Sequence, residues 1–366
     1  MDSRVEEHAR IIVEHSVDVT AGDEVVISVP PAAEDLAVAL NEQIAQKDAF
    51  PIQAGLMGEG RRRRAFLRAM EPDAYDDPPE TLQVMAEHAD VAIVVRAAEN
   101  ARELADVPPE NHGAFAELME PIRDEMMDKR WVGTQHPAAG NAQDAEMSTA
   151  AYADFVYDAV AKDWDAQREF QANLVDILDE GSTVHIVSGE TTDLTMSIDG
   201  MQAVNDYAER NLPGGEVFTA PVTDSVEGEV LFDKPVVRRG TEIEDARLVF
   251  EDGEVVEHEA EKNEEMLTAM LETDDGASRL GELGVGMNRD IDRFTKNMLF
   301  DEKMGDTIHL ALGRAYDECV GPNRDANQSA LHMDMIVDMS EDSRIEVDGE
   351  VIQRDGTFVF EDGFDE

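Results

Sequence analysis

The chain has 366 residues, which is long enough for two domains, and 42% of them are hydrophobic, which is enough for a sizeable core. Its 83 acidic residues outnumber the 30 basic ones and leave a net charge of -53, which argues against nucleic acid as a partner because an acidic surface repels phosphate. The single cysteine, Cys319, excludes an intrachain disulfide and a thiolate-cluster zinc site.

The N-terminus is charged and has no apolar core of the kind that a signal peptide carries. No apolar stretch approaches the ~20 residues that span a bilayer, so we expect a cytoplasmic protein with no membrane partner. Ser3 and Glu6 match a capping box, which predicts a first helix with Ser3 as its N-cap. The basic cluster at residues 61–64 predicts an exposed helix start or local salt-bridge partners.

Strands and helices alternate through the first part of the chain. The sequence predicts a helix at 34–46 and strands at 24–29, 51–57 and 91–95, the last with an apolar run typical of a strand buried on both faces. This alternation indicates an α/β domain with a mostly parallel sheet at residues 1–165. No GxGxxG or P-loop pattern follows these strands, so a nucleotide site has no support here.

The C-terminal part changes to short strands. A helical stretch at 147–177 precedes the change, and residues 361–366 are expected to form a frayed acidic tail. We expect residues 166–366 to form a β-rich α+β domain. Its predicted strands lie at 183–187, 216–222, 247–250, 307–312 and 330–339, and its predicted turns lie at 348–349 and 355–356.

The acidic residues are spread along the whole chain and interleaved with apolar periodicity, which favours a folded protein over a disordered acidic tail. Lysine is scarce, so arginine supplies most of the positive charge. At about 1 M salt the Debye length is only about 3 Å, and repulsion between these acids would be screened. The charge therefore predicts a halophilic protein.

Two predicted strands each present a histidine on a polar face. His332 and Asp334 are two residues apart, so they point to the same side of a strand, where both can reach one cation. His309 is flanked on its own face by small residues, which leave room beside the imidazole. For either strand alone, the alternative is a polar face that meets water.

Carboxylates from elsewhere would have to complete such a site. Glu216 follows a Pro-Gly-Gly turn, and Glu282 lies in an otherwise apolar, glycine-punctuated run at 280–286. A buried carboxylate needs a cation, whereas the alternative for each is a solvated side chain.

The string NLPGGEVFTAP at 211–221 is similar to the hallmark of the M29 (thermophilic aminopeptidase T/S-like) metalloaminopeptidase family. Later motifs occur in the order of that family, and the resemblance is specific mainly from about residue 191 onward. These motifs are LGE at 280–282, LFDEK at 299–303, IHLALG at 308–313 and SALHMD at 329–334.

The resemblance implies a peptide hydrolase that removes N-terminal residues from peptides through a water activated by two divalent ions (Zn, Co or Mn), which carboxylates and imidazoles suit. It implies a catalytic role for Tyr316, whose alternative is a wall residue at the end of a strand, and for Glu216. It also implies a catalytic C-terminal domain and a homodimer. The implied metal ligands, with a carboxylate bridging the ions, are Glu216, Glu282, His309, His332 and Asp334.

Two alternatives stay open: a non-catalytic metal- or peptide-binding protein, and a metal-dependent amidase or dipeptidase on the same fold. The stretch between His309 and His332 is shorter than is usual in the family, and Gly321-Pro322-Asn323 stands where Gly-Gly-Asn is commoner. A trimmed loop here predicts altered access for the substrate.

Overall fold

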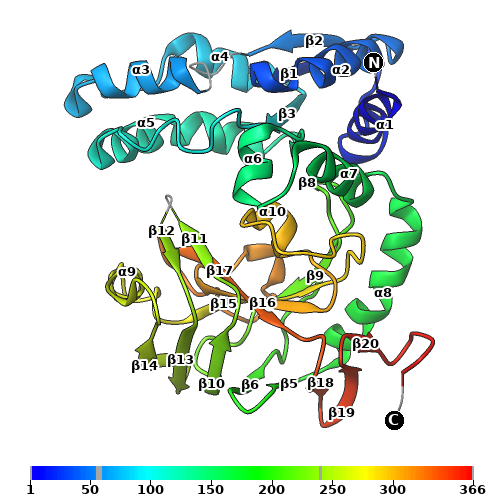
Figure 1. Cartoon of the computed structure of the whole chain (residues 1–366), viewed down its shortest axis with the longest axis vertical. Helices are drawn as coiled ribbons and strands as arrows, with labels where there is room; N and C mark the ends of the chain where they lie inside the picture. The colour runs from blue at the N-terminus through cyan, green and yellow to red at the C-terminus, as the bar shows by residue number, and fades with distance from the viewer. Residues whose placement is uncertain (1, 55–59, 239–240, 365–366) are drawn as a thin grey trace. The chain divides into compact units, whose positions relative to one another are not determined.

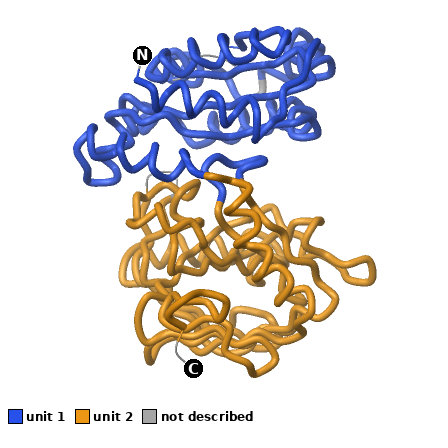
Figure 2. Tube along the Cα trace, turned by 90° about the vertical axis from the view of Figure 1, so that its right-hand side faces the viewer, with its two compact units in different colours: residues 1–162, 208–214 blue, residues 163–207, 215–366 orange. Residues whose placement is uncertain are grey.

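The computed structural model describes residues 2–54, 60–238 and 241–364. The chain divides into two compact units, shown in Figures 1 and 2. Unit 1 comprises residues 1–162 and 208–214, and unit 2 comprises residues 163–207 and 215–366. After entering unit 2, the chain thus returns to unit 1 for the seven residues 208–214. No pattern in the sequence indicates this return.

Unit 1 contains a five-stranded parallel sheet in the order β2-β1-β3-β4-β8. Its strands are β1 (Glu24–Ser28), β2 (Phe50–Gln53), β3 (Val91–Arg96), β4 (Arg130–Gln135) and β8 (Asn211–Leu212). The parallel α/β prediction is confirmed. Part of the predicted strand at 51–57 lies outside the described residues. The last strand, β8, comes from the returning segment and pairs with β4.

Helices connect the strands of this sheet. They are α1 (Ser3–Ile11), α2 (Glu34–Gln46), α3 (Arg61–Ala69), α4 (Glu80–His88), α5 (Pro109–Met127), α6 (Ala139–Asp144) and α7 (Thr149–Val160), with a π-helical turn at Ile12–Ser16 and 3-10 turns at Pro31–Ala33 and Pro72–Ala74.

Two details of the predicted helices in this region are wrong. Asp2 caps α1, because its carboxylate accepts a hydrogen bond from the backbone N–H of Arg4, so the helix does not use Ser3 as its cap. The helical stretch at 147–177 is two helices, because Asp163 leaves the helical conformation and caps the second one through the backbone N–H of Ala166. The basic cluster at 61–64 begins α3, and Arg64 forms a salt bridge with Asp106, in agreement with the predicted helix start and salt-bridge partners.

Unit 2 begins with α8 (Trp164–Glu180) and contains two large antiparallel sheets. The eight-stranded sheet has the order β14-β13-β10-β6-β5-β18-β19-β20. Its strands are β5 (Thr183–Ser188), β6 (Thr192–Ser197), β10 (Glu227–Phe232), β13 (Ala246–Glu251), β14 (Glu254–Glu259), β18 (Ser343–Val347), β19 (Glu350–Arg354) and β20 (Thr357–Phe358).

The five-stranded sheet has the order β17-β16-β15-β9-β7. Its strands are β7 (Val204–Asp206), β9 (Glu216–Thr219), β15 (Leu280–Gly286), β16 (Thr307–Gly313) and β17 (His332–Asp338). A separate two-stranded sheet is formed by β11 (Val236–Arg238) and β12 (Thr241–Ile243). The remaining helical segments of unit 2 are α9 (Glu264–Leu271), α10 (Met298–Asp301) and a 3-10 turn at Asp317–Cys319.

Apolar residues from both large sheets, α8 and α9 form one continuous core, as expected for a β-rich α+β domain. The predicted frayed tail is partly wrong: the Glu361 carboxylate accepts hydrogen bonds from Arg289 and from the backbone N–H of Phe358, and residues 365–366 lie outside the described residues. Within the described ranges, no helix combines the length and the apolar character needed to cross a membrane.

Candidate metal centre

The five-stranded sheet has two different faces. Residues paired across neighbouring strands point to the same side, so Val217, Val285 and Ile308 lie together in the core of unit 2. The alternate residues lie on the opposite face, which we call the polar face. It carries Asp206, Glu216, Phe218, Glu282, Gly284, Gly286, His309, Ala311, Gly313, His332 and Asp334.

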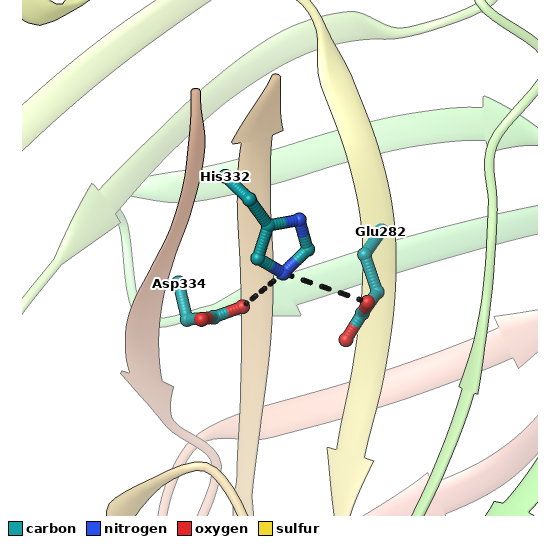
Figure 3. Close-up of side chains that lie close together, drawn as sticks. All are labelled: Glu282, His332 and Asp334. Carbon is teal, nitrogen blue, oxygen red and sulfur yellow. Dashed lines mark ion pairs between the residues drawn. The ribbon is translucent and has the colours of Figure 1, made fainter. Parts of the chain in front are cut away.

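Three side chains on this face converge within reach of a single cation (Figure 3). One ligand atom from each of Glu282, His332 and Asp334 lies within 4.8 Å of the others. Nε2 of His332 is 3.3 Å from Oδ1 of Asp334 and 3.9 Å from Oε2 of Glu282. The other ring nitrogen, Nδ1, donates to the carbonyl of Arg314 at 2.8 Å, so the lone pair for a metal is on Nε2.

A second group shares Glu282 with the first. Nε2 of His309 is 2.9 Å from Oε1 of Glu282 and 3.4 Å from Oε2 of Glu216. The Glu282 carboxylate therefore lies between the two histidines, with one oxygen toward His309 and the other toward His332. All five residues implied as metal ligands gather on one face, from β9, β15, β16 and β17.

Glycine on the neighbouring strand makes room for His309. Gly284 is paired with His309 in the sheet, and a Cβ on it would lie 2.0 Å from two atoms of the imidazole. No side chain fits there, so this position depends on glycine. The small residues that flank His309 along its own strand are a weaker cause of the space than this partner across the sheet.

A buried lysine lies at the other end of the polar face. Nζ of Lys303 is 2.9 Å from Oε1 of Glu216, 3.6 Å from Oδ2 of Asp206, and in contact with the Glu302 carboxylate. The side chain of Lys303 is fully buried. Sequence reasoning assigned no role to Lys303, Glu302 or Asp206, although the first two lie in the LFDEK motif. Burial of a lysine cannot be inferred from the motif alone.

The electrostatics of the site are those of buried acids crowded around few cations. Burial raises the pKa values of Glu216 and Glu282 above their ordinary range. Burial alone would lower the pKa of His309, but the hydrogen bond to Glu282 and the charge of Glu216 raise it to about 10. His332 follows the same pattern, with a pKa of about 9 caused mainly by Asp334.

The remaining pKa shifts agree with an excess of negative charge. Burial would raise the pKa of Asp334, but its hydrogen bond to His332 lowers it to about 2. Burial would lower the pKa of the Lys303 ammonium, and the charges of Glu216 and Glu302 instead raise it well above its ordinary value. These groups retain their charges by pairing with one another.

Buried oxygens test whether a metal fits this site. Oε2 of Glu216 and Oε2 of Glu282 are buried, and neither accepts a hydrogen bond from any residue that the structure describes. A buried carboxylate oxygen without a donor is costly, and a cation removes that cost. Carboxylate oxygens and imidazole nitrogens together suit Zn, Co or Mn. The residues present therefore fit a divalent metal.

Tyr316 stands beside this group, just after β16. Its ring centroid is 4.8 Å from that of His332 and 6.1 Å from that of Phe218, and the residue is 42% exposed. Partial burial of the side chain and the charge of Glu282 raise its pKa above the ordinary value. The hydroxyl is therefore protonated at neutral pH and can donate a hydrogen bond next to the candidate ligands.

A group of buried and partly buried carboxylates and imidazoles on one face of a sheet, with the partly exposed Tyr316 beside it, defines a candidate metalloenzyme. Residues 1–364 match the family described as thermophilic metalloprotease (M29), and the chain belongs to this family. The resemblance read from the motifs is confirmed.

Curated relatives agree with this assignment over part of their length. Aminopeptidase 2 of Geobacillus stearothermophilus is 35% identical over 172 residues, and aminopeptidase T of Thermus thermophilus is 37% identical over 157 residues. The first alignment covers 41% of this chain and 40% of the relative, and the second covers 40% and 37%. The chain thus spans well under half the length of these relatives in the alignments.

Solved structures show the same fold over the whole chain. The structure of wild-type AmpT from Thermus thermophilus matches with a TM-score of 0.85 and 25% identity, covering 98% of this chain and 99% of that one. A 2,5-dihydroxypyridine dioxygenase from Pseudomonas putida KT2440 matches with a TM-score of 0.62 at 15% identity over 99% of both chains. The second match shows only that the fold also occurs in a protein described as a dioxygenase.

Proposed function

We propose that this chain is a metal-dependent aminopeptidase that acts on peptides with a free N-terminus. The observation that carries the proposal is the Glu282 carboxylate, which is buried between His309 and His332 with one oxygen toward each. Family membership and the names of the relatives support the substrate class.

In this proposal five residues of the polar face would hold two divalent ions: Glu216, Glu282, His309, His332 and Asp334. Glu282 would be shared between the two groups, because it lies between His309 and His332. The ions, Zn, Co or Mn, would supply an activated water and polarise the carbonyl of the first peptide bond.

The proton and the developing charge are handled by the chain itself. Glu216 is also proposed to take part in the transfer of the proton from the attacking water. The Tyr316 hydroxyl donates a hydrogen bond to the oxyanion, since it is protonated and lies beside His332. The alternative role of Tyr316 is a wall of the substrate site.

The proposal extends to the setting in which the enzyme works. A net charge of -53 favours function in high salt and argues against nucleic-acid partners. The enzyme is proposed to work in the cytoplasm. The enzyme is proposed to act as a homodimer, with its catalytic residues in the domain at 166–366. The short stretch between His309 and His332 is proposed to alter substrate access.

Hydrolysis of leucine p-nitroanilide in high-salt buffer tests the proposal. We expect the activity to disappear when the metal is removed, to return with Zn, Co or Mn, and to be absent in a Glu216→Ala variant. N-acetyl-leucine p-nitroanilide, which lacks the free amine, serves as the control substrate and should not be cleaved.

Other outcomes separate the alternatives. Equal cleavage of the acetylated substrate would favour an amidase over an aminopeptidase. A folded, metal-loaded chain that cleaves neither substrate would contradict the proposed function and favour a dipeptidase or a binding protein.

A further inference from the structure

Lys303 is the most deeply buried charge of the polar face. Its side chain has no exposed surface, and three acidic residues surround its ammonium: Asp206 from β7, Glu216 from β9, and the adjacent Glu302. Burying an ammonium group costs several kcal/mol unless it is paired. The buried ammonium of Lys303 is therefore tolerated only because it pairs with the carboxylates around it.

The backbone that carries Lys303 is held firmly. Asp301 accepts hydrogen bonds from the backbone N–H groups of Thr295 and Asn297 at 2.7 and 2.8 Å, which ties the loop before Lys303 to itself. The carbonyl of Lys303 accepts from the backbone N–H of Asn288 at 3.0 Å.

A glycine lets this segment lie close to the sheet. A Cβ on Gly286 would lie 2.0 Å from the carbonyl oxygen of Met304 and 3.0 Å from the carbonyl carbon of Lys303. Gly286 is paired with Glu216 across the sheet, so the same glycine brings Lys303 within reach of that carboxylate.

The two oxygens of Glu216 have different surroundings. Oε1 accepts a hydrogen bond from Nζ of Lys303 at 2.9 Å. Oε2 accepts no hydrogen bond from the described residues and lies 3.4 Å from Nε2 of His309. Lys303 thus holds one oxygen and leaves the other directed at the candidate ligands.

We propose that Lys303 is a positioning residue of the metal centre, which holds Oε1 of Glu216 so that Oε2 is presented to the ion beside His309. This inference rests on the proposed function in so far as that function places a divalent ion there. Lys303 does not touch the substrate in this proposal and acts only through Glu216.

Whether the loss of Lys303 weakens or tightens metal binding distinguishes two roles: orienting Glu216, or merely repelling the ion by its charge. If Lys303 only repelled a divalent ion, removing its charge would tighten metal binding, because like charges oppose each other at short range. If Lys303 positions Glu216, removing it weakens binding, since loss of a partner that orients a ligand typically costs about 10–100-fold in metal affinity.

Calorimetric titration of Co²⁺ into the metal-stripped chain in high salt makes this measurement without substrate. We expect Lys303→Met to weaken binding about 10–100-fold and Lys303→Arg, which keeps the charge, to weaken it less. Lys234→Met is the matched control, because Lys234 also pairs with two acids, Asp233 and Asp338, but touches no candidate ligand. Unchanged or tighter binding by Lys303→Met would overturn the proposal.

A double-mutant cycle shows whether Lys303 acts through Glu216. In a Glu216→Gln background, Lys303→Met should change the affinity for Co²⁺ by less than about twofold, because the interaction it removes is already absent. Independent, additive losses would contradict the proposal. Thermal denaturation shows whether Lys303→Met folds. If it does not, the double variant Lys303→Met with Glu302→Gln, which removes one unpaired acid, should show the same weakening of Co²⁺ binding.

The outcome for Lys303 is separable from that for the proposed function. A wild-type chain that binds Co²⁺ but cleaves no peptide would refute the aminopeptidase and leave the Lys303 test intact. A chain that cleaves peptides, with an affinity for Co²⁺ that Lys303→Met leaves unchanged, would refute only the role of Lys303. A wild-type chain that binds no Co²⁺ would refute both.

Discussion

In β9 and β15 of unit 2, the two faces of the five-stranded sheet are both buried and are chemically opposite. Val217 and Leu283 on the core face are 0% and 1% exposed, while Glu216 and Glu282 on the polar face are 6% and 5% exposed. Burial of the apolar residues stabilises the fold, whereas burial of the acids opposes it. Exposure alone therefore does not identify a functional face, whereas the chemistry of the buried groups does.

Of the substitutions considered, that of Gly284 should cause the largest loss of activity and of bound metal. In a Gly284→Ala variant the new Cβ would meet the His309 ring at 2.0 Å and displace it, and a displacement of about 1 Å can cost about 100-fold in rate. We expect at least that loss of leucine p-nitroanilide hydrolysis, together with loss of bound metal by elemental analysis.

The control for this variant is Gly113→Ala in α5, where an added Cβ meets no atom within 4 Å. It should leave activity and metal content unchanged. A Gly284→Ala chain with full activity would mean that His309 does not bind the metal.

Substituting Leu283 should instead destabilise the core face of the same sheet. Leu283 is one residue from Glu282 but points into the core, so Leu283→Ala should lower the free energy of unfolding by about 2–5 kcal/mol. Denaturant titration in high salt measures this loss. Glu282→Gln is the opposite case and should lose metal binding with a smaller change in stability; equal losses of stability in both variants would erase the distinction between the faces.

Substituting Tyr316 tests the open side of the polar face. Tyr316→Phe keeps the ring beside His332 and removes the hydroxyl, and loss of one donor to an oxyanion costs about 100-fold in kcat. We expect that fall in kcat, with bound metal and KM little changed. Undiminished kcat would leave Tyr316 as a wall residue.

His8 in unit 1 extends the comparison to a buried histidine without acidic partners. Like His309 it is fully buried, yet burial lowers the pKa of His8 to about 3, whereas nearby carboxylates raise the pKa of His309 to about 10. Its Nε2 is 2.8 Å from the Thr134 hydroxyl, which donates its own proton to the Leu212 carbonyl, so His8 is the donor.

The pH dependence of stability follows from the lowered pKa of His8. The unfolded chain, with an ordinary histidine pKa near 6.5, binds a proton that the folded chain does not, so stability is present above pH 6.5 and is lost as the pH falls from there toward 3. Between pH 7 and 5 the loss from His8 is about 2 kcal/mol. His8→Gln should lose less stability over that range, measured by denaturant titration, and parallel curves for the two chains would contradict this assignment.

Part of the polar face can be predicted from the spacing of residues within one strand. The rest depends on the register between strands. The two-residue separation of His332 and Asp334 already requires a shared side of one strand. That Gly284 faces His309 depends on the pairing of β15 with β16, in which the register shifts between Leu280 and Glu282. No pattern local to either strand predicts such a shift.

Other features depend on segments that meet only in the folded chain. Asp206 joins the polar face because β7 pairs with β9, and Lys303 enters it from a loop. The excursion of residues 208–214 into unit 1 depends on β8 pairing with β4, far away in the sequence. The alternation of strands and helices, by contrast, was sufficient to predict the parallel sheet.

Anomalous diffraction from crystals loaded with Co²⁺ or Zn²⁺ tests the central claim most directly, because it locates each ion without reference to activity. We expect two peaks on the polar face, one on each side of the Glu282 carboxylate. The first should lie beside Glu216 and His309, and the second beside His332 and Asp334. A single peak, or peaks that do not contact Glu282, would contradict this arrangement.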